Sequence, residues 1–115
     1  MALHHNPRIA LEGLILALDA ADTNSYPGSG TTWYDLSSLD KDFSLGGGPG
    51  LSTNGIGSLT FDGGTQFADG PALPNATTDW TIEVWFYPTS VTNYENILDF
   101  NFAYTPNSGN IGPRL

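Results

Sequence analysis

Hydrophobic and polar residues alternate most regularly between Thr81 and Tyr87, a pattern typical of a β-strand. One face of this strand would carry Ile82, Val84 and Phe86, and the other would carry Thr81, Glu83, Trp85 and Tyr87. Because both faces hold aromatic residues, we expect a strand in the middle of its sheet. Ile82, Val84 and Phe86 should be buried on one face, and Trp85 on the other against the second sheet or a partner.

A second apolar segment, Leu14–Leu18, is continuous and not alternating, which predicts a strand buried on both faces. Gly13 just before it is expected to form a kink or bulge. Weaker patterns predict further extended segments at Ile9–Leu11, Trp33–Leu36, Ser58–Phe61, Gln66–Ala68 and Asn96–Tyr104.

Glycine and proline separate these segments and predict the turns between them. Pro27-Gly28 fits a type II turn, in which Gly28 takes a positive φ. Residues Gly46–Gly50 read GGGPG and predict a loop, and Asp62–Gly64 predicts a tight hairpin between its flanking strands. A last turn is expected at Pro106–Asn110. No segment has the 3.6-residue period of a helix, so the predicted class is all-β.

Composition limits the size of the fold and the kinds of partner. The 115 residues predict one domain over residues 9–115, preceded by an N-terminal arm over residues 1–8. The formal net charge is −9 and there are 3 strong bases, so neither nucleic acid nor an anionic membrane is an expected partner. No apolar run is long enough to cross a bilayer. With no cysteine, stability must come from packing alone.

Three blocks of sequence resemble the concanavalin A-like, laminin-G-like jelly-roll modules found in phage structural proteins. They are LILALDAADTNSYPGSGTTWYDLS, GSLTFDGGTQF and WTIEVWFYP, in the same order as in those modules. The resemblance implies a jelly-roll β-sandwich. Such modules continue with several more strands beyond the point corresponding to Leu115, so we expect a shortened sandwich with an open edge near Phe100–Tyr104.

The residues that could carry catalysis are poorly placed for it, so no catalytic residue is predicted and the chain is not expected to be an enzyme. A retaining glycosidase needs two carboxyl groups about 5–5.5 Å apart. On its own strand Glu83 has Thr81 and Trp85 two residues away. The two histidines lie in the arm, which disfavours a serine–histidine–aspartate triad.

The acidic residues offer a weak calcium hypothesis. Asp40 and Asp42 alternate as calcium ligands do, but the EF-hand pattern fails because Leu45 and Leu51 stand where glycine and glutamate are needed. Four more aspartates match acidic positions of the resembling modules. Their short side chains commonly cap turns, which we favour over a metal site and over any other cofactor. They are Asp19, Asp22, Asp35 and Asp62.

The sequence leaves two functional hypotheses from different classes. The first is a virion structural protein on the outer surface of a phage particle, a capsid decoration or cement protein that contacts copies of itself or other virion proteins as an oligomer. Its contact candidates are Arg8, Ile9, Leu11, Phe100, Phe102 and Tyr104. The second is a carbohydrate-binding, lectin-like module for host-surface glycan, such as part of a tail or fibre protein, whose candidates are Asn93, Tyr94, Asn96, Tyr104 and Asn107.

Overall fold

The structure is a computed structural model and describes residues 9–73, 79–89, 97–100 and 113–114. Within these residues the chain forms antiparallel strands and no helix. The all-β prediction is confirmed at this level. No helix in the described part of the chain is long and apolar enough to span a membrane.

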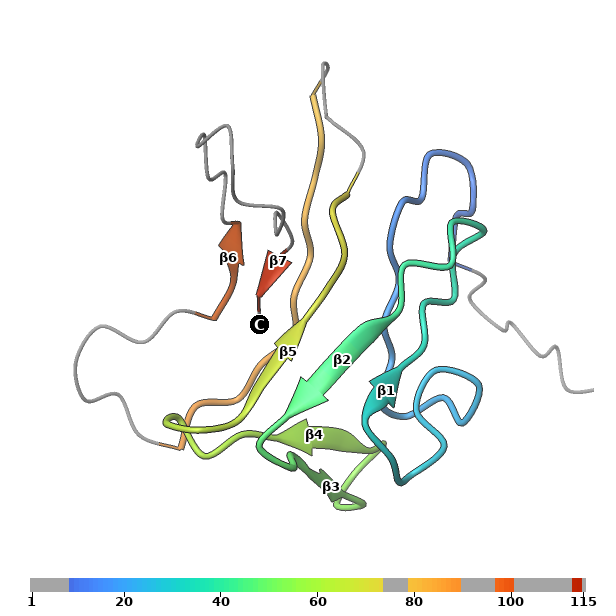
Figure 1. The fold of residues 1–115 in the computed structure, drawn as a ribbon. Coiled ribbons are helices and arrows are strands. Elements are labelled where there is room, and N and C mark those ends of the chain that lie inside the picture. The colour runs from blue at the N-terminus through green and yellow to red at the C-terminus, as the bar shows by residue number, and fades with distance from the viewer. Residues whose placement is uncertain (1–8, 74–78, 90–96, 101–112, 115) are drawn as a thin grey trace, which may run out of the picture.

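A five-stranded sheet has the order β1-β2-β5-β7-β6. Its strands are β1 (Thr32–Trp33), β2 (Phe43–Gly46), β5 (Phe67–Asp69), β6 (Asp99–Phe100) and β7 (Pro113–Arg114). A two-stranded sheet is formed by β3 (Gly50–Ser52) and β4 (Ser58–Thr60). Figure 1 shows β1, β2 and β5 side by side, with the β3–β4 hairpin lying across one end of them.

The core lies around β2, whose burial alternates as its sequence does. Phe43 and Leu45 are buried while Ser44 is exposed, and Tyr26 and Ala68 complete the buried cluster. Five partly buried apolar residues pack against it: Leu16, Leu18, Trp33, Leu51 and Leu59. The turn predicted at Pro27-Gly28 brings Tyr26 to this core, and Gly28 has the expected positive φ of 95°.

Two strands predicted near the start of the described chain are absent. Leu14–Leu18 is half-buried but forms no strand, since its hydrogen bonds join it to Leu11, to Leu36 and to the side chains of Asp35 and Ser37 and form no ladder. The Ala17 N–H donates to Asp35 Oδ1 at 2.8 Å, and the Leu36 N–H donates to the Ala17 carbonyl at 2.8 Å. Residues 9–11 also form no strand, and Ile9 and Leu11 are exposed.

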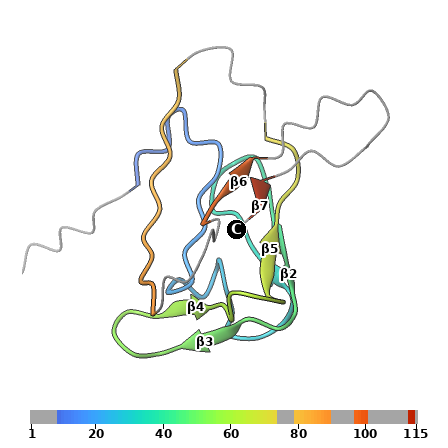
Figure 2. The same cartoon turned by 90° about the vertical axis from the view of Figure 1, so that its left-hand side faces the viewer.

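The central strand predicted at Thr81–Tyr87 is wrong. None of the described strands pairs with this segment, and its residues are exposed, Phe86 by 59 % and Trp85 by 90 %. The core positions facing β2 are filled from Tyr26, Leu16 and Ala68 instead. Figure 2 shows residues 79–89 as an extended trace on the side of the molecule opposite β2 and β5.

The hairpin predicted around Asp62–Gly64 is also wrong, although both of its strands are present. β4 pairs with β3, and β5 pairs with β2, so the two strands belong to different sheets. The loop is closed by side chains and not by a strand ladder. Asp62 Oδ1 accepts the N–H groups of Gly64, Thr65 and Gln66, and the Asp62 N–H donates to Gln66 Oε1 at 2.8 Å.

The glycine loop is shorter than predicted, because Gly46 ends β2 and Gly50 begins β3. Gly46 is needed in the strand since a Cβ there would meet the ring of Phe67. Near the C-terminus, Phe100 pairs with Pro113 in β7, so the edge expected there without a later partner has one. The turn predicted at 106–110 lies outside the described residues.

Candidate functional site

The Asp35 carboxylate accepts four hydrogen bonds, as many as the exposed Asp62 carboxylate accepts. It is buried, and its Oδ1 accepts the N–H groups of Ala17 at 2.8 Å and Ser37 at 2.9 Å. Its Oδ2 accepts the Ser37 hydroxyl at 2.5 Å and the Lys41 N–H at 2.9 Å. The carboxylate therefore joins the 14–18 segment to the loop after β1.

Burial alone would raise the pKa of Asp35, but the hydrogen bonds from Ser37, Ala17 and Lys41 outweigh it and hold the pKa below its ordinary value of 3.8. An ionised carboxylate whose acceptor positions are filled by N–H and O–H donors stabilises a loop and leaves no lone pair aimed at a ligand. The geometry makes Asp35 a structural residue.

The other aspartates singled out from the sequence cap turns in the same way. The Ala21 N–H donates to Asp19, and the Asn24 N–H donates to Asp22. Asp62 also accepts the Thr65 hydroxyl at 2.6 Å, and these hydrogen bonds hold the pKa of the Asp62 carboxyl well below its usual range. The turn-capping interpretation is the one that these contacts support.

The calcium candidates do not form a ligand cluster. Asp42 Oδ1 accepts the Asp35 N–H at 2.9 Å, and Asp40 is an exposed turn residue with a positive φ of 50°. Across the described ranges, no three acidic, histidine or cysteine side chains lie close enough together to hold a metal ion. Asp40 and Asp42 are thus placed as parts of the loop that Asp35 organises.

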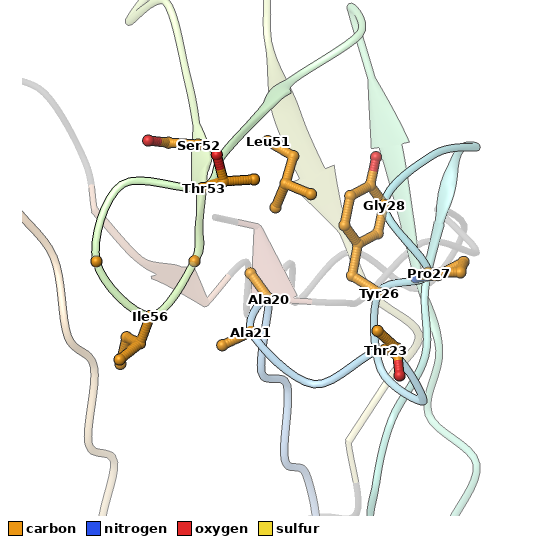
Figure 3. A pocket seen from close by; sticks show the side chains of 12 residues that line it. Ala20, Ala21, Thr23, Tyr26, Pro27, Gly28, Leu51, Ser52, Thr53 and Ile56 are labelled. Atoms are coloured by element: carbon orange, nitrogen blue, oxygen red, sulfur yellow. The ribbon is translucent and has the colours of Figure 1, made fainter.

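A surface hollow of about 270 Å³ lies between the Tyr26–Gly28 turn and the β3–β4 loop (Figure 3). Its lining is made of small, hydroxyl and apolar residues, among them Ala20, Thr23, Leu51, Ser52 and Ile56. No carboxylate, imidazole or basic side chain lines it. The hollow is at the small end of ligand sites and has no group that could move a proton at neutral pH. Sequence reasoning missed it, because its lining residues carry no recognisable motif.

Segment 79–89 carries several large apolar side chains that are exposed. Trp85 is 90 % exposed and Tyr87 is 89 % exposed, while Ile82 and Val84 on the alternate positions are 43 % and 41 % exposed. The exposure therefore alternates with the two-residue period of a strand. The segment runs as an extended trace (Figure 2), and none of the described strands pairs with Thr81–Tyr87.

The contact and glycan candidates are unevenly placed relative to the described residues. Ile9 and Leu11 lie exposed at the start of the described chain, and Phe100 lies in β6. Arg8, Phe102 and Tyr104 lie outside the described residues. The remaining glycan candidates also lie outside them, namely Asn93, Tyr94, Asn96 and Asn107.

Comparison with known proteins adds no relative. No protein-family model, no curated protein and no solved structure matches this chain.

Proposed function

We propose that this chain is a structural protein that works by binding other protein subunits, as a decoration or cement protein on the outer surface of a phage particle. The observation that carries this proposal is the exposed segment 79–89. Contiguous exposed apolar patches on a protein surface often mark interaction sites. The net charge of −9 on the same chain disfavours nucleic acid and anionic membranes as partners.

As part of the same proposal, we assign the chain a jelly-roll β-sandwich fold. Antiparallel sheets, the absence of helix in the described residues and the packing of the Tyr26 turn against β2 support it. The virion and the outer surface are proposed on the resemblance of the three sequence blocks to phage structural modules.

The test is the protein inventory of purified phage particles from the source culture, measured by mass spectrometry and by labelling with an antibody against this chain. We expect the chain in many copies per particle, with the label on the outside of the capsid. If the chain is absent from particles and binds a glycan array, the carbohydrate-binding alternative replaces the proposal.

A further inference from the structure

The loop between β3 and β4 contains the only Asn-Gly step in the sequence, Asn54-Gly55. The loop covers residues 53–57, and both residues of the step are exposed. Gly55 and its neighbours Thr53 and Ile56 line the hollow beside the Tyr26 turn (Figure 3). Exposed loop tips are the parts of a fold that are held least firmly, so the backbone of this step can move without unfolding the rest.

We propose that Asn54 is a site of spontaneous deamidation. The backbone nitrogen of Gly55 gives its proton to solvent and attacks the side-chain carbonyl carbon of Asn54, which forms a new C–N bond. The bond from that carbon to the side-chain nitrogen then breaks, and ammonia leaves with a proton taken from solvent, so that a succinimide ring remains. Water opens the ring at either carbonyl and gives aspartate or isoaspartate. The net reaction consumes one water and releases one ammonia, with no change of oxidation state.

The surroundings of Gly55 leave room for that attack. Gly55 has a positive φ of 77°, and a Cβ built on it would meet nothing within 4 Å, so its backbone is not packed against a neighbour. With no side chain of its own, Gly55 also changes its backbone angles readily. The Asn54 N–H donates to Ser52 Oγ at a long 3.4 Å. Among the described residues, no hydrogen bond holds the Asn54 side-chain amide or the Gly55 N–H.

The step Asn24-Ser25 is the natural comparison, because serine is also small, and here the structure protects both reacting groups. The Ser25 N–H donates to the Asp22 carbonyl at 2.9 Å, and Ser25 is fully buried. The side-chain amide of Asn24 donates to Asp22 Oδ1 at 2.9 Å, and so does the Asn24 N–H at 2.8 Å. Ring closure at Asn24 therefore requires the Asp22–Ser25 turn to open first.

The two Asp-Gly steps can form the same ring by losing water, and the structure protects them as well. The Asp62 carboxylate accepts four hydrogen bonds within its own loop, which keep it in place as an ionised group. Asp69 is held in β5 by pairing with β2 and β7. Gly70, which follows it, packs so closely against the ring of Phe43 that a Cβ would clash there. Of these four steps, Asn54-Gly55 is the one that the fold leaves unprotected.

Deamidation would change the charge and the length of the loop. It adds one negative charge to a chain that carries −9, beside a hollow whose lining has no charged side chain. Isoaspartate also carries the main chain through the side-chain carbon, which lengthens the loop. Gly57 in this loop is close to Ala21, since a Cβ on Gly57 would lie 3.2 Å from the Ala21 Cα. We expect the longer loop to disturb this contact and the shape of the hollow.

Site-resolved peptide mapping of the full chain tests the proposal. The chain is incubated in mildly alkaline buffer, with and without denaturant, and deamidation and isoaspartate are measured at each asparagine by mass spectrometry. Folding should change the rate at Asn54 by less than about threefold and should slow the rate at Asn24 by at least about tenfold, because only the Asn24 turn must open. The rate at Asn54 should rise with pH, since the attacking nitrogen must lose its proton.

The variant Asn54→Gln makes the assignment specific. It should remove the isoaspartate signal at position 54 and leave the rate at Asn24 unchanged, because glutamine would have to close a larger ring. An Asn54 rate that falls on folding as much as the Asn24 rate would overturn the proposal. So would a folded chain without isoaspartate at Asn54 after the denatured chain has converted. Neither result depends on whether the chain occurs in phage particles, so the proposed function stands or fails separately.

Discussion

At the scale of single residues, the Asp35 carboxylate stabilises the fold through four hydrogen bonds that a neutral amide cannot reproduce. Asp35→Asn keeps the shape of the side chain but turns an N–H₂ group toward N–H or O–H donors. We expect the free energy of unfolding to fall by about 2 kcal/mol, as measured by denaturant titration. The control Asp40→Asn should be neutral, because asparagine tolerates the positive φ at that exposed position.

The same residue predicts how stability depends on pH. The pKa of Asp35 is lower in the folded chain than its ordinary value of 3.8, so its contribution is complete above about pH 5 and is lost as the pH falls through the folded-state pKa. Unfolding free energies measured between pH 7 and pH 2.5 should therefore fall less steeply for Asp35→Asn than for the unmodified chain. Equal slopes would show that folding does not lower the pKa of Asp35.

Alanine substitutions at two adjacent glycines, Gly47 and Gly48, distinguish the effect of backbone strain on stability from that of a steric clash. Gly47 and Gly48 have almost the same positive φ, 73° and 70°, so alanine is equally strained at either position. A Cβ on Gly47 would also run into the Thr65 carbonyl group, whereas a Cβ on Gly48 would meet nothing within 4 Å. Thermal melting should show Gly47→Ala to be less stable than Gly48→Ala by at least about 1 kcal/mol. Similar melting temperatures for the two variants would argue against the close approach of Thr65.

At the scale of elements, the buried strand is β2. Phe43 is 1 % exposed and Phe86 is mainly exposed, so Phe43→Ala should cost about 3–5 kcal/mol and Phe86→Ala less than about 1 kcal/mol in the monomer. Denaturant titration at a low protein concentration compares them directly. The reverse order would mean that the Thr81–Tyr87 strand, and not β2, lines the core.

The elements also show what the sequence could and could not reveal. Turns were predictable, since Gly13, Gly28 and Gly63 have positive φ where the sequence placed kinks and turns, and aspartates cap their loops as expected. Strand partners were not predictable. Alternation at Thr81–Tyr87 indicates an extended chain with two different faces, but it does not say which segment pairs with it.

Side-chain chemistry explains the other differences between the predicted and the observed structure. The sequence around Asp62 favours a tight hairpin, but the carboxylate collects three N–H groups and holds a wider loop, so β4 and β5 separate into two sheets. The hollow beside Tyr26 could not be found from the sequence, because hydroxyl and small apolar residues of this kind are common on any protein surface.

At the scale of the whole molecule, the N-terminal arm is expected to serve attachment and not folding. Deleting residues 1–8 removes none of the side chains of the described core. The truncated chain should keep its melting temperature but bind purified particles more weakly, by at least about tenfold if Arg8 and its neighbours pair along a neighbouring edge. Co-sedimentation with particles measures the binding. Unchanged binding would remove the arm from the assembly contacts.

The order of strands in the five-stranded sheet has a consequence for the time course of folding. β1, β2 and β5 follow one another closely along the chain, whereas the pairing of Asp69 with Arg114 closes a much longer loop. Closing longer loops costs more entropy and slows the search for the native pairing. During synthesis β1, β2 and β5 can pair before the C-terminal residues have left the ribosome. β7 must then pair with the free edge of β5, and β6 with β7. Until they do, this edge is the place where a nascent chain is most exposed to misassembly.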